Sequence, residues 1–289
     1  MTSLPSVAVI IPTFNRKDKL CRFLNLISQQ TYPNLQVIVV DSSSSDGTAN
    51  IVLSRFPQVT LVQVSDQEYW TGATNAGVQL ALERQVDFIF TINDDAVILP
   101  NHIVQLIELS EQKQLSILGS QINYLAPADR VWSLGTYSDW GTDRFLKIAY
   151  NDINISKIPS DILNKDLISV DTLPGNGVLI RASIFKQIGL YNAKFCPHYH
   201  GDSELIMRAN KFGFEAWITP NIIVFNDFSN DQKKILLKTI CGLRYAFLNP
   251  RSHLFMLPIF YLIWEYCPLP QKLPTLWSLL QRLGQMRKS

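Results

Sequence analysis

The sequence is poor in cysteine, and its cysteines are far apart. The 289-residue chain has four of them and no CxxC pair: Cys21, Cys196, Cys241 and Cys267. This spacing indicates neither a zinc knuckle nor a disulfide framework, and it favours a protein of a reducing compartment. Charged residues are also scarce, at 17% against 47% hydrophobic residues. Such a composition excludes disorder and favours a large core or a membrane-facing surface.

Signals for export and for spanning a membrane are missing. The N-terminal segment MTSLPSVAVIIP has no basic residue before its short apolar run, and the run ends at Pro12. We therefore interpret it as a first strand and not as a signal peptide. The apolar stretch over residues 254–264 is eleven residues long and contains Pro258. That is too short for the roughly 30 Å hydrocarbon core of a bilayer, but it is long enough to lie on one.

The sequence also lacks two common phosphate-binding loops. A dinucleotide-binding chain carries GxGxxG after its first strand, whereas this chain reads PTFNR at 12–16, and it has no Walker loop. A sugar nucleotidyltransferase would carry a GGxGxR-like loop at the same place, so that class of enzyme is disfavoured. No internal repeat or low-complexity linker is present, and we expect no nucleic-acid partner.

Apolar runs alternate with segments of helical spacing along the first half of the chain. Strands are predicted over 7–11, 35–40, 59–64, 88–92 and 115–124, and helices over 17–30, 48–56, 73–84 and 100–114. This alternation predicts an α/β fold with a doubly wound, mostly parallel sheet. Residues 125–169 predict irregular hairpins or loops. A strand at 178–180, helices over 182–188 and 203–212, and strand positions between 217 and 224 follow.

The strand over 88–92 runs directly into Asn93, Asp94 and Asp95. In open α/β sheets, ligands bind outside the carboxyl ends of the strands, which is where these side chains are expected. Two adjacent carboxylates repel each other unless a cation or a hydrogen-bonding ligand offsets their charge, so a divalent ion with phosphate oxygens is one interpretation. The other is an Asx-rich turn that caps the helix after Pro100.

Several short segments follow one another in a characteristic order. They are PTFNR at 12–16, an acid at 41 after the second strand, WTGATNAG at 70–77, NDD at 93–95, GNG at 175–177 and HYHGDSELIMR at 198–208. In this order and spacing they resemble the family 2 inverting glycosyltransferases of the GT-A fold, over about residues 6–227. The resemblance implies transfer of a sugar from a UDP- or dTDP-linked donor to a hydroxyl of a glycan or lipid-linked acceptor, in bacterial polysaccharide or O-antigen assembly.

The resemblance places the nucleotide at the ends of the first two strands. It implies that the Asp41 carboxylate accepts hydrogen bonds from uracil or thymine, and a carboxylate suits such an N–H donor. Taken alone, Asp41 is more typical of a cap on the Ser-rich turn that follows. The glycines of 70–77 would let the backbone approach the donor. The implied donor contacts are Pro12, Thr13, Asn15, Arg16, Asp41, Gly72, Asn75, Asn93 and Asp94.

The resemblance also implies a divalent cofactor, Mg²⁺ or Mn²⁺, which would act as a Lewis acid on the leaving diphosphate. Asp95 matches the family's metal-binding acid. Asn93 stands where the usual motif has an acid, which leaves fewer charges for the metal. Many relatives carry a histidine ligand after the last core strand, and here Asp227 or Asn226 would have to replace it.

Asp202 matches the second acid of the family's EDxDLxxR pattern, which is the general base, although Gly201 replaces the first acid. A carboxylate opposite the leaving group takes the proton of the acceptor hydroxyl and gives inversion. The alternative is an N-cap of the following helix. Trp70 is either a sugar platform or a core residue, and a loop histidine is more often structural. The residues implied on the acceptor side are Trp70, Gly175, Asn176, Gly177, His200, Glu204 and Arg208.

The chain divides by charge into a body and a tail. We expect a catalytic domain at 1–230, with a nucleotide-sugar half to about 115 and an acceptor half over 116–230. A helical tail over 231–289 carries nine Lys and Arg against two acids. Such a tail would dock a cytoplasmic enzyme on the anionic inner face of the membrane. The alternative is packing on the catalytic domain or, in a homodimer, on a second subunit.

A second class of function is a catalytically inactive relative that binds a glycan or a protein partner. The departures at Gly201 and Asn226 support it, whereas the intact Asp95, Asp202 and Arg208 count against it.

Overall fold

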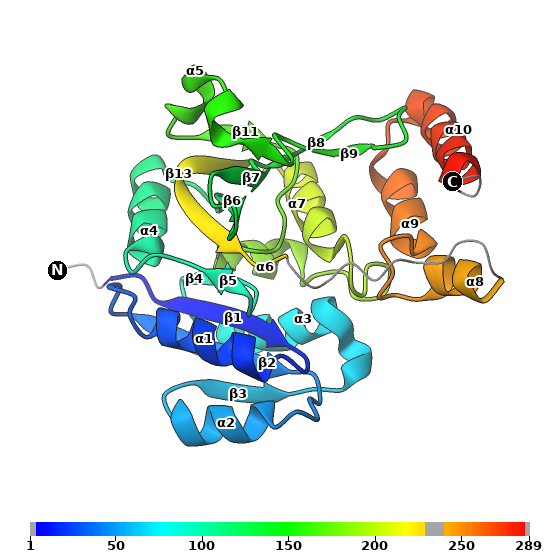
Figure 1. The fold of residues 1–289 in the computed structure, drawn as a ribbon. Helices are drawn as coiled ribbons and strands as arrows, with labels where there is room; N and C mark the ends of the chain where they lie inside the picture. The colour runs from blue at the N-terminus through cyan, green and yellow to red at the C-terminus, as the bar shows by residue number, and fades with distance from the viewer. Residues whose placement is uncertain (1–3, 229–239, 287–289) are drawn as a thin grey trace.

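The computed structural model describes residues 4–228 and 240–286, which form an α/β fold (Figure 1). One large sheet holds these strands: β1 (Val7–Thr13), β2 (Leu35–Asp41), β3 (Thr60–Gln63), β4 (Phe88–Thr91), β5 (Ala96–Val97), β6 (Ile117–Tyr124), β7 (Arg130–Ser133), β10 (Ile153–Asn154), β11 (Ile168–Val170), β12 (Val178–Arg181) and β13 (Ala216–Asn226). A separate hairpin pairs β8 (Thr136–Ser138) with β9 (Leu146–Ile148).

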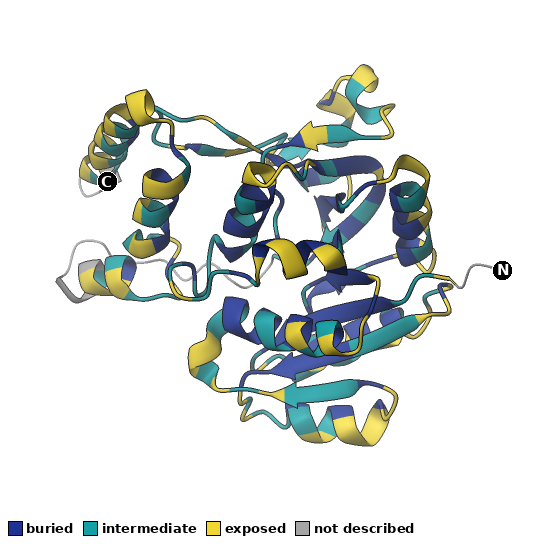
Figure 2. Ribbon diagram, turned by 180° about the vertical axis from the view of Figure 1, so that it is seen from behind, coloured by how far each residue is buried: buried dark blue, intermediate teal, exposed yellow. Residues whose placement is uncertain are grey.

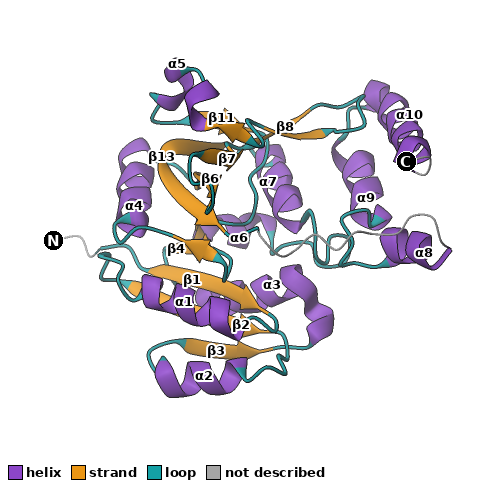
Figure 3. Ribbon diagram, viewed as in Figure 1, coloured by secondary structure: helices purple, strands orange, loops and turns teal. Residues whose placement is uncertain are grey.

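Helices cover both faces of the sheet (Figure 3). They are α1 (Lys17–Ile27), α2 (Thr48–Arg55), α3 (Tyr69–Glu83), α4 (His102–Lys113), α5 (Ser160–Leu163), α6 (Ala182–Ile188), α7 (Gly201–Lys211), α8 (Ile240–Leu248), α9 (Met256–Tyr266) and α10 (Leu269–Met286).

The centre of the sheet is parallel. β1 pairs in parallel with β2 and β4, and β2 pairs in parallel with β3. The strand order is β10-β7-β6-β12-β4-β1-β2-β3, with β12 antiparallel to both of its neighbours and β13 running parallel to β6. The predicted doubly wound, mostly parallel sheet is therefore confirmed.

Alternate residues of β1 face two different cores, because successive side chains of a strand point to opposite faces. Val7, Val9 and Ile11 join the core under α1 and α4, whereas Ala8 and Ile10 join the core under α3. All five are fully buried, and burial on both faces explains the continuous apolar run that predicted the strand. The packed centre fixes the points where the strands end, and these ends position the polar residues that follow.

Residues 125–169 are more regular than the sequence predicts. β7 and β10 extend the large sheet beyond β6, and β11 pairs with β13. The β8–β9 hairpin reaches the C-terminal helices instead. These strands have two to four residues each, which is too short for a recognisable period of apolar residues.

The three C-terminal helices lie along one side of the molecule, next to α7 and the β8–β9 hairpin (Figure 1). Leu262 and Ile263 of α9 are buried against Phe145 and Met207, so the tail packs on the rest of the chain as the alternative interpretation holds. Among the described residues, no helix is both long and apolar enough to cross a bilayer. The tail cations that lie outside the described residues are Lys233, Lys234, Lys238, Arg287 and Lys288.

The predicted start of one helix is wrong. The sequence predicts a glycine turn at 70–72 and a helix from 73, whereas α3 begins at Tyr69. Glycine is unfavourable inside a helix, and this led the prediction away from the first turn. Gly72 is nonetheless buried there, and a Cβ at Gly77 would lie 2.6 Å from Ile10 Cγ2. Close packing of α3 on β1 therefore requires Gly77, and the predicted approach of its backbone to a nucleotide stays a prediction.

Candidate active site

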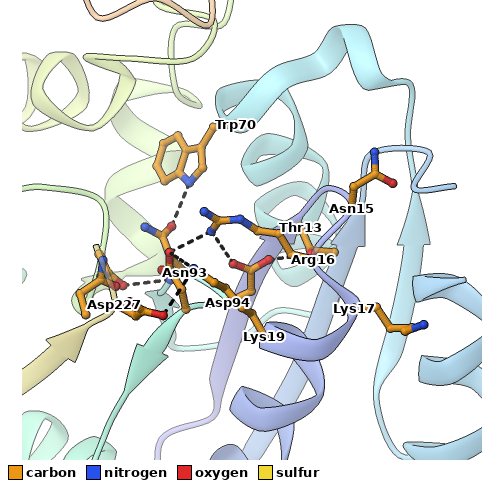
Figure 4. Close-up of polar contacts among 12 residues, drawn as sticks. Thr13, Asn15, Arg16, Lys17, Lys19, Trp70, Asn93, Asp94 and Asp227 are labelled. Carbon is orange, nitrogen blue, oxygen red and sulfur yellow. Dashed lines mark hydrogen bonds and ion pairs between the residues drawn. The ribbon is translucent and has the colours of Figure 1, made fainter. Parts of the chain in front are cut away.

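The carboxyl ends of β1 and β4 bring an acidic pair and its counter-cations together (Figure 4). Thr13, the last residue of β1, donates a hydrogen bond from Oγ1 to Asp94 Oδ2 at 2.7 Å. The Arg16 guanidinium donates through Nη1 to Asp94 Oδ1 and to Asp95 Oδ2, each at 2.9 Å. Three predicted donor contacts, Thr13, Arg16 and Asp94, thus share one hydrogen-bonded cluster, and Pro12 adjoins it on β1.

Asp94 is almost completely buried in this cluster, with 2% of its surface exposed. Burial raises the pKa of Asp94 to about 6, although the Arg16 guanidinium and the Thr13 hydroxyl oppose the shift; the Asp95 charge adds to it. Because Thr13 and Arg16 engage both of its oxygens, Asp94 holds the turn after β1 in place and has little surface left for a sugar.

Asp95 and Asp227 face a shared cation, the ammonium of Lys19 on α1. Lys19 Nζ lies 4.0 Å from Asp95 Oδ2 and 3.7 Å from Asp227 Oδ2. The short strand β5 brings the two acids together, since Ala96 pairs with Asn226 of β13. The structure therefore joins the two acids predicted as metal ligands, but it places a lysine beside both of them.

These residues do not form a metal site as they are arranged. In the described part of the chain, no group of three or more His, Cys, Asp and Glu side chains is placed to hold a metal ion. Mg²⁺ in proteins needs several oxygen ligands in a near-octahedral set. Here Arg16 and Lys19 both lie beside Asp95, and Lys19 also lies beside Asp227. In this arrangement the two cations lie where a divalent ion would bind, and the predicted ion stays a prediction.

Asp41 combines both predicted interpretations. Its Oδ1 accepts a hydrogen bond from the Ser44 N–H at 3.1 Å, as a cap of the Ser-rich turn does. Its Oδ2 is buried and has no hydrogen-bond partner among the described residues. A buried carboxylate oxygen without a donor is unfavourable, and a pyrimidine N–H is a donor of the right kind. The geometry is thus compatible with base recognition at Asp41.

Asn15 links the loops that follow β1 and β2. Its φ of 52° lies in the left-handed region, which asparagine tolerates better than most residues. Its N–H donates to Ser44 Oγ and its Oδ1 accepts from the Ser45 N–H, each at 2.8 Å. Asn15 therefore holds the two loops together, and its predicted contact with the nucleotide stays a prediction.

Trp70 contacts both the NDD turn and the GNG turn, and Figure 4 shows its ring next to Asn93. Its Nε1–H donates to Asn93 Oδ1 at 3.1 Å. Its ring packs edge to face with the Tyr191 ring, and the two ring centroids are 5.7 Å apart. A Cβ at Gly175 would lie 2.5 Å from the Trp70 ring and 3.2 Å from Asp202 Cβ, so the ring requires glycine there. Trp70 is half-buried, which leaves part of its surface accessible.

Asn176 joins the ends of two strands. Its Oδ1 accepts from the Asn93 N–H at 2.9 Å, and its Nδ2 donates to Asn226 Oδ1 at 3.1 Å. Gly177 has a φ of 79°, and a Cβ there would lie 2.6 Å from Val224, so backbone conformation and packing both require glycine. The GNG turn thus fixes the NDD turn against the end of β13.

Asp202 lies in the first turn of α7, beside the GNG turn. Its Oδ2 accepts from the Gly175 N–H at 2.7 Å, and its Oδ1 accepts from the Ser203 N–H at 2.8 Å. The N-cap of α7 is His200, and the helix begins at Gly201. The alternative in which Asp202 is the N-cap is therefore wrong. The carboxylate is half-buried and oriented by two backbone donors.

Glu204 and Arg208 form a buried ion pair further along α7. Arg208 donates from Nε and Nη2 to Glu204 Oε1 and Oε2 at 3.1 and 2.9 Å, and also to the carbonyls of Ile188 and Leu190. The Tyr266 hydroxyl of α9 donates to Glu204 Oε1 at 2.8 Å. This pair ties α7 to the end of α6 and to the tail, and its predicted contact with the acceptor stays a prediction.

Three further predicted residues, Asn75, Gly72 and His200, lie against other groups of the chain itself. Asn75 donates from Nδ2 to the Tyr191 carbonyl at 2.8 Å and accepts from the Tyr191 N–H at 2.9 Å. A Cβ at Gly72 would lie 2.1 Å from Glu68 Oε2. His200 has a φ of 66°, and burial lowers the pKa of its imidazole while the Asp202 carboxylate opposes that shift.

His198 is structural, as the more common interpretation of a loop histidine holds. Its Nδ1 accepts a hydrogen bond from the Trp70 N–H at 3.4 Å, which requires that nitrogen to be unprotonated. Burial lowers the pKa of His198 to about 4, and the nearby charges of Arg251, His253 and Arg16 act in the same direction.

Sequence reasoning missed Lys19. Its signal was present, because three cations at 16, 17 and 19 follow the first strand, at the sheet edge where the acids after β4 also lie. Basic residues at the start of a helix are unusual, since the positive end of the helix dipole disfavours them. A cluster of this kind points to nearby acids or to an anionic ligand.

Comparison with known proteins agrees with this geometry. The family model described as Glycosyl transferase family 2 matches residues 8–189. Glycosyltransferase GlyG of Streptococcus pneumoniae is 28% identical over 122 residues, which cover 41% of this chain and 40% of that protein. The GalNAc(5)-diNAcBac-PP-undecaprenol beta-1,3-glucosyltransferase of Campylobacter jejuni is 20% identical over 201 residues, which cover 69% and 57%. The matches thus span about half the length of these curated relatives.

A solved structure shares the fold. Mannosyltransferase PcManGT from Pyrobaculum calidifontis, in complex with GDP-Man and Mn²⁺, superposes with a TM-score of 0.57 at 16% identity, over 99% of this chain and 74% of that one. The predicted GT-A fold is confirmed by this likeness.

Proposed function

Because the chain belongs to glycosyl transferase family 2, we propose that it is an inverting glycosyltransferase. The proposed donor is a UDP- or dTDP-linked sugar, and the proposed acceptor is a hydroxyl of a glycan or lipid-linked sugar in polysaccharide assembly. The observation that carries the proposal is the Asp202 carboxylate, which is held by the Gly175 N–H next to the Trp70 ring, and this ring is bonded to Asn93.

In this mechanism Asp202 is the catalytic base. The carboxylate takes the proton of the acceptor hydroxyl while the hydroxyl oxygen forms its bond to the anomeric carbon. The bond from that carbon to the diphosphate breaks on the opposite face, so the configuration inverts. The two backbone donors keep the carboxylate in a fixed orientation. This lowers the entropic cost of reaching the reactive geometry.

The leaving diphosphate needs positive charge, and Arg16 and Lys19 are proposed to supply it. Both already face the acids at the end of β4, so a bound diphosphate would share them with Asp95. PcManGT is in complex with Mn²⁺. A divalent ion held by Asp95 and Asp227 would supply Lewis-acid chemistry at the leaving diphosphate, and Mg²⁺ or Mn²⁺ stays a prediction for this chain.

A binding panel tests donor recognition. We expect UDP or dTDP, and not GDP, to raise the melting temperature, because a ligand that binds the folded state stabilises it by mass action. Each nucleotide is measured with Mn²⁺ and with EDTA, and we expect the preferred nucleotide to raise the melting temperature in both conditions. No stabilisation by any nucleotide would contradict the function, whereas stabilisation in Mn²⁺ alone would contradict the role of the protein cations.

We propose that the chain divides into a catalytic part at 1–230 and a docking tail at 231–289. The outer surface of the tail supports an acceptor that lies in a membrane. Figure 2 shows exposed positions on α9 and α10, and on each helix the exposed large apolar residues form a stripe at helical spacing. The stripes together are called the outer apolar face, with 41–81% exposure at Leu257, Phe260, Trp264, Leu269, Leu273, Trp277 and Leu280.

The charge of the tail favours an anionic bilayer as the occupant of this face. Lys272 joins the two stripes, since its Nζ donates to the Trp264 carbonyl at 2.6 Å and lies 5.0 Å from the Trp264 ring centroid. The tail has nine basic residues against two acids. Each Lys or Arg gains on the order of 1 kcal/mol of binding free energy near an anionic leaflet. Tryptophans are enriched at membrane interfaces.

Flotation with vesicles that contain anionic lipid tests this docking. Deleting the tail would expose the core around Leu262, so the better variant is Trp264→Glu with Trp277→Glu. We expect it to lose vesicle binding, and Leu53→Glu, at an exposed leucine of α2, to keep it. Equal binding by all three proteins would contradict the proposal. So would a dimer in light scattering that the double substitution dissociates, because the face would then be a protein interface.

A further inference from the structure

The linker between α8 and α9 lies against the donor side of the candidate active site. The Arg251 guanidinium carbon is 4.8 Å from the ring centroid of Phe14 and 5.4 Å from that of Tyr69. Its Nη2 donates to the Asp66 carbonyl at 3.3 Å. Phe14 sits between the predicted donor contacts in PTFNR, and Tyr69 precedes Trp70, so a tail residue reaches two segments assigned to the donor.

The linker is held in this position by other contacts. Ser252 is buried, and the His253 ring stacks on Tyr199 at 4.0 Å between centroids. Tyr199 in turn meets the edge of His198, and His198 meets the edge of Tyr69. A continuous row of rings thus joins the linker to the start of α3 and to the loop before α7.

The surroundings of Arg251 suit an anion. In the part of the chain that the structure describes, no carboxylate lies within ion-pair distance of its guanidinium. The side chain is exposed, and its charge, together with that of Arg16, lowers the pKa of His198 after the larger effect of burial. Arg251 contacts Phe14, which is two residues before Arg16, so the two guanidinium groups belong to different segments that meet at the loop after β1. A planar guanidinium supported by aromatic rings is well suited to bidentate binding of phosphate.

We propose that Arg251 is a donor-binding residue contributed by the tail, and that its guanidinium pairs with the diphosphate of the nucleotide sugar opposite Arg16. The inference rests on the proposed function and extends it, because the family match ends at residue 189 and the linker lies beyond it. The packing of α9 on the catalytic part then has a second consequence. It holds a phosphate ligand at the mouth of the site.

Calorimetric titration of UDP, dTDP and GDP into the full chain tests the proposal. Arg251→Ala weakens binding of the preferred nucleoside diphosphate about tenfold or more, since a charged hydrogen-bond donor to phosphate is removed. Binding of the matching nucleoside, followed by ligand-observed NMR, stays within about twofold, because it lacks phosphate. Arg251→Lys gives an intermediate loss. The matched control Arg244→Ala, at an exposed arginine of α8, leaves both affinities unchanged.

Three results would overturn the inference. Diphosphate affinity that Arg251→Ala leaves unchanged removes the proposed contact. An equal loss for diphosphate and nucleoside assigns Arg251 to packing on Phe14 and Tyr69, and melting curves without ligand show whether that packing was lost. A wild-type chain that binds none of the three nucleotides overturns the proposed function and this inference with it. If the wild type binds a nucleotide and only the effect of Arg251→Ala is missing, this inference fails alone, so the two failures are distinguishable.

Discussion

At the scale of single residues, the site is organised by amide side chains that bridge separate loops. Asn15, Asn75 and Asn176 each bond to a second segment far away in the sequence. An amide carries both a donor and an acceptor, so one asparagine can satisfy an N–H and a carbonyl at once without a net charge. The sequence shows that these residues are present, but it does not show whether their partners are protein groups or a ligand.

Gly175 leaves room for the Trp70 ring because it has no side chain. Gly175→Ala would place a Cβ 2.5 Å from the Trp70 ring, so the ring or the turn must move. We expect a loss of about 1–3 kcal/mol in stability, as for other overpacked sites, and reduced transfer because Asp202 loses its backbone donor. Gly284→Ala, with no atom within 4 Å, is the matched control and should be neutral or slightly stabilising in thermal unfolding. Equal behaviour of the two variants would contradict the packing argument.

His102 gives the stability of the protein a pH dependence. Burial lowers the pKa of His102 to about 3, and the neutral ring is bonded to Ser120 Oγ at 3.1 Å. In the unfolded chain the His102 imidazole takes up a proton near pH 6.5, whereas in the folded chain it stays neutral until about pH 3. The neutral, buried His102 therefore contributes its full stabilisation above pH 6.5, and this stabilisation is lost as the pH falls toward 3. Between pH 7 and pH 5 the wild type should lose about 2 kcal/mol more than His102→Gln in urea unfolding. Parallel losses would contradict this assignment.

At the scale of elements, the sequence predicts what periodicity and burial determine. β1, β2 and β4 have apolar runs that are buried toward the centre of the sheet, and the predicted positions of the four strands before residue 93 agree with β1 to β4. The start of α3 was missed because tertiary packing overrides the low helix propensity of glycine at Gly72 and Gly77. The short strands after residue 125 were missed because pairing with distant segments, and not local pattern, defines them.

The C-terminal helices are part of the same folded unit as the sheet. Leu262 is fully buried with Phe145 and Met207, whereas Leu273 on α10 is 78% exposed. Leu262→Ala should therefore lower the free energy of unfolding by about 2–5 kcal/mol, as buried leucines do. The matched control Leu273→Ala should change it by no more than about 0.5 kcal/mol. Measurements in urea that give equal, small effects would show that α9 is not packed on the rest of the chain.

At the scale of the whole molecule, topology brings together residues that the sequence keeps far apart. Asp95 and Asp227 meet because β5 pairs with β13, and the tail returns to Phe14 through Arg251. Motif order predicted the family and the general location of the site, since motifs at strand ends meet at one sheet edge. Lys19 was missed although its signal was present, whereas the contact of the tail with Phe14 could not be predicted, because it depends on where a later segment packs.

The most direct test of the central claim separates transfer from donor binding in Asp202→Asn. The measurement is sugar transfer from the preferred donor to a lipid-linked glycan fraction, alongside calorimetry with the matching nucleoside diphosphate. A base acts on the acceptor proton, so transfer should fall by about 10²–10⁴-fold while nucleotide affinity stays within about threefold. Retained transfer, or nucleotide binding lost in parallel with transfer, would contradict the assignment of Asp202 as the base.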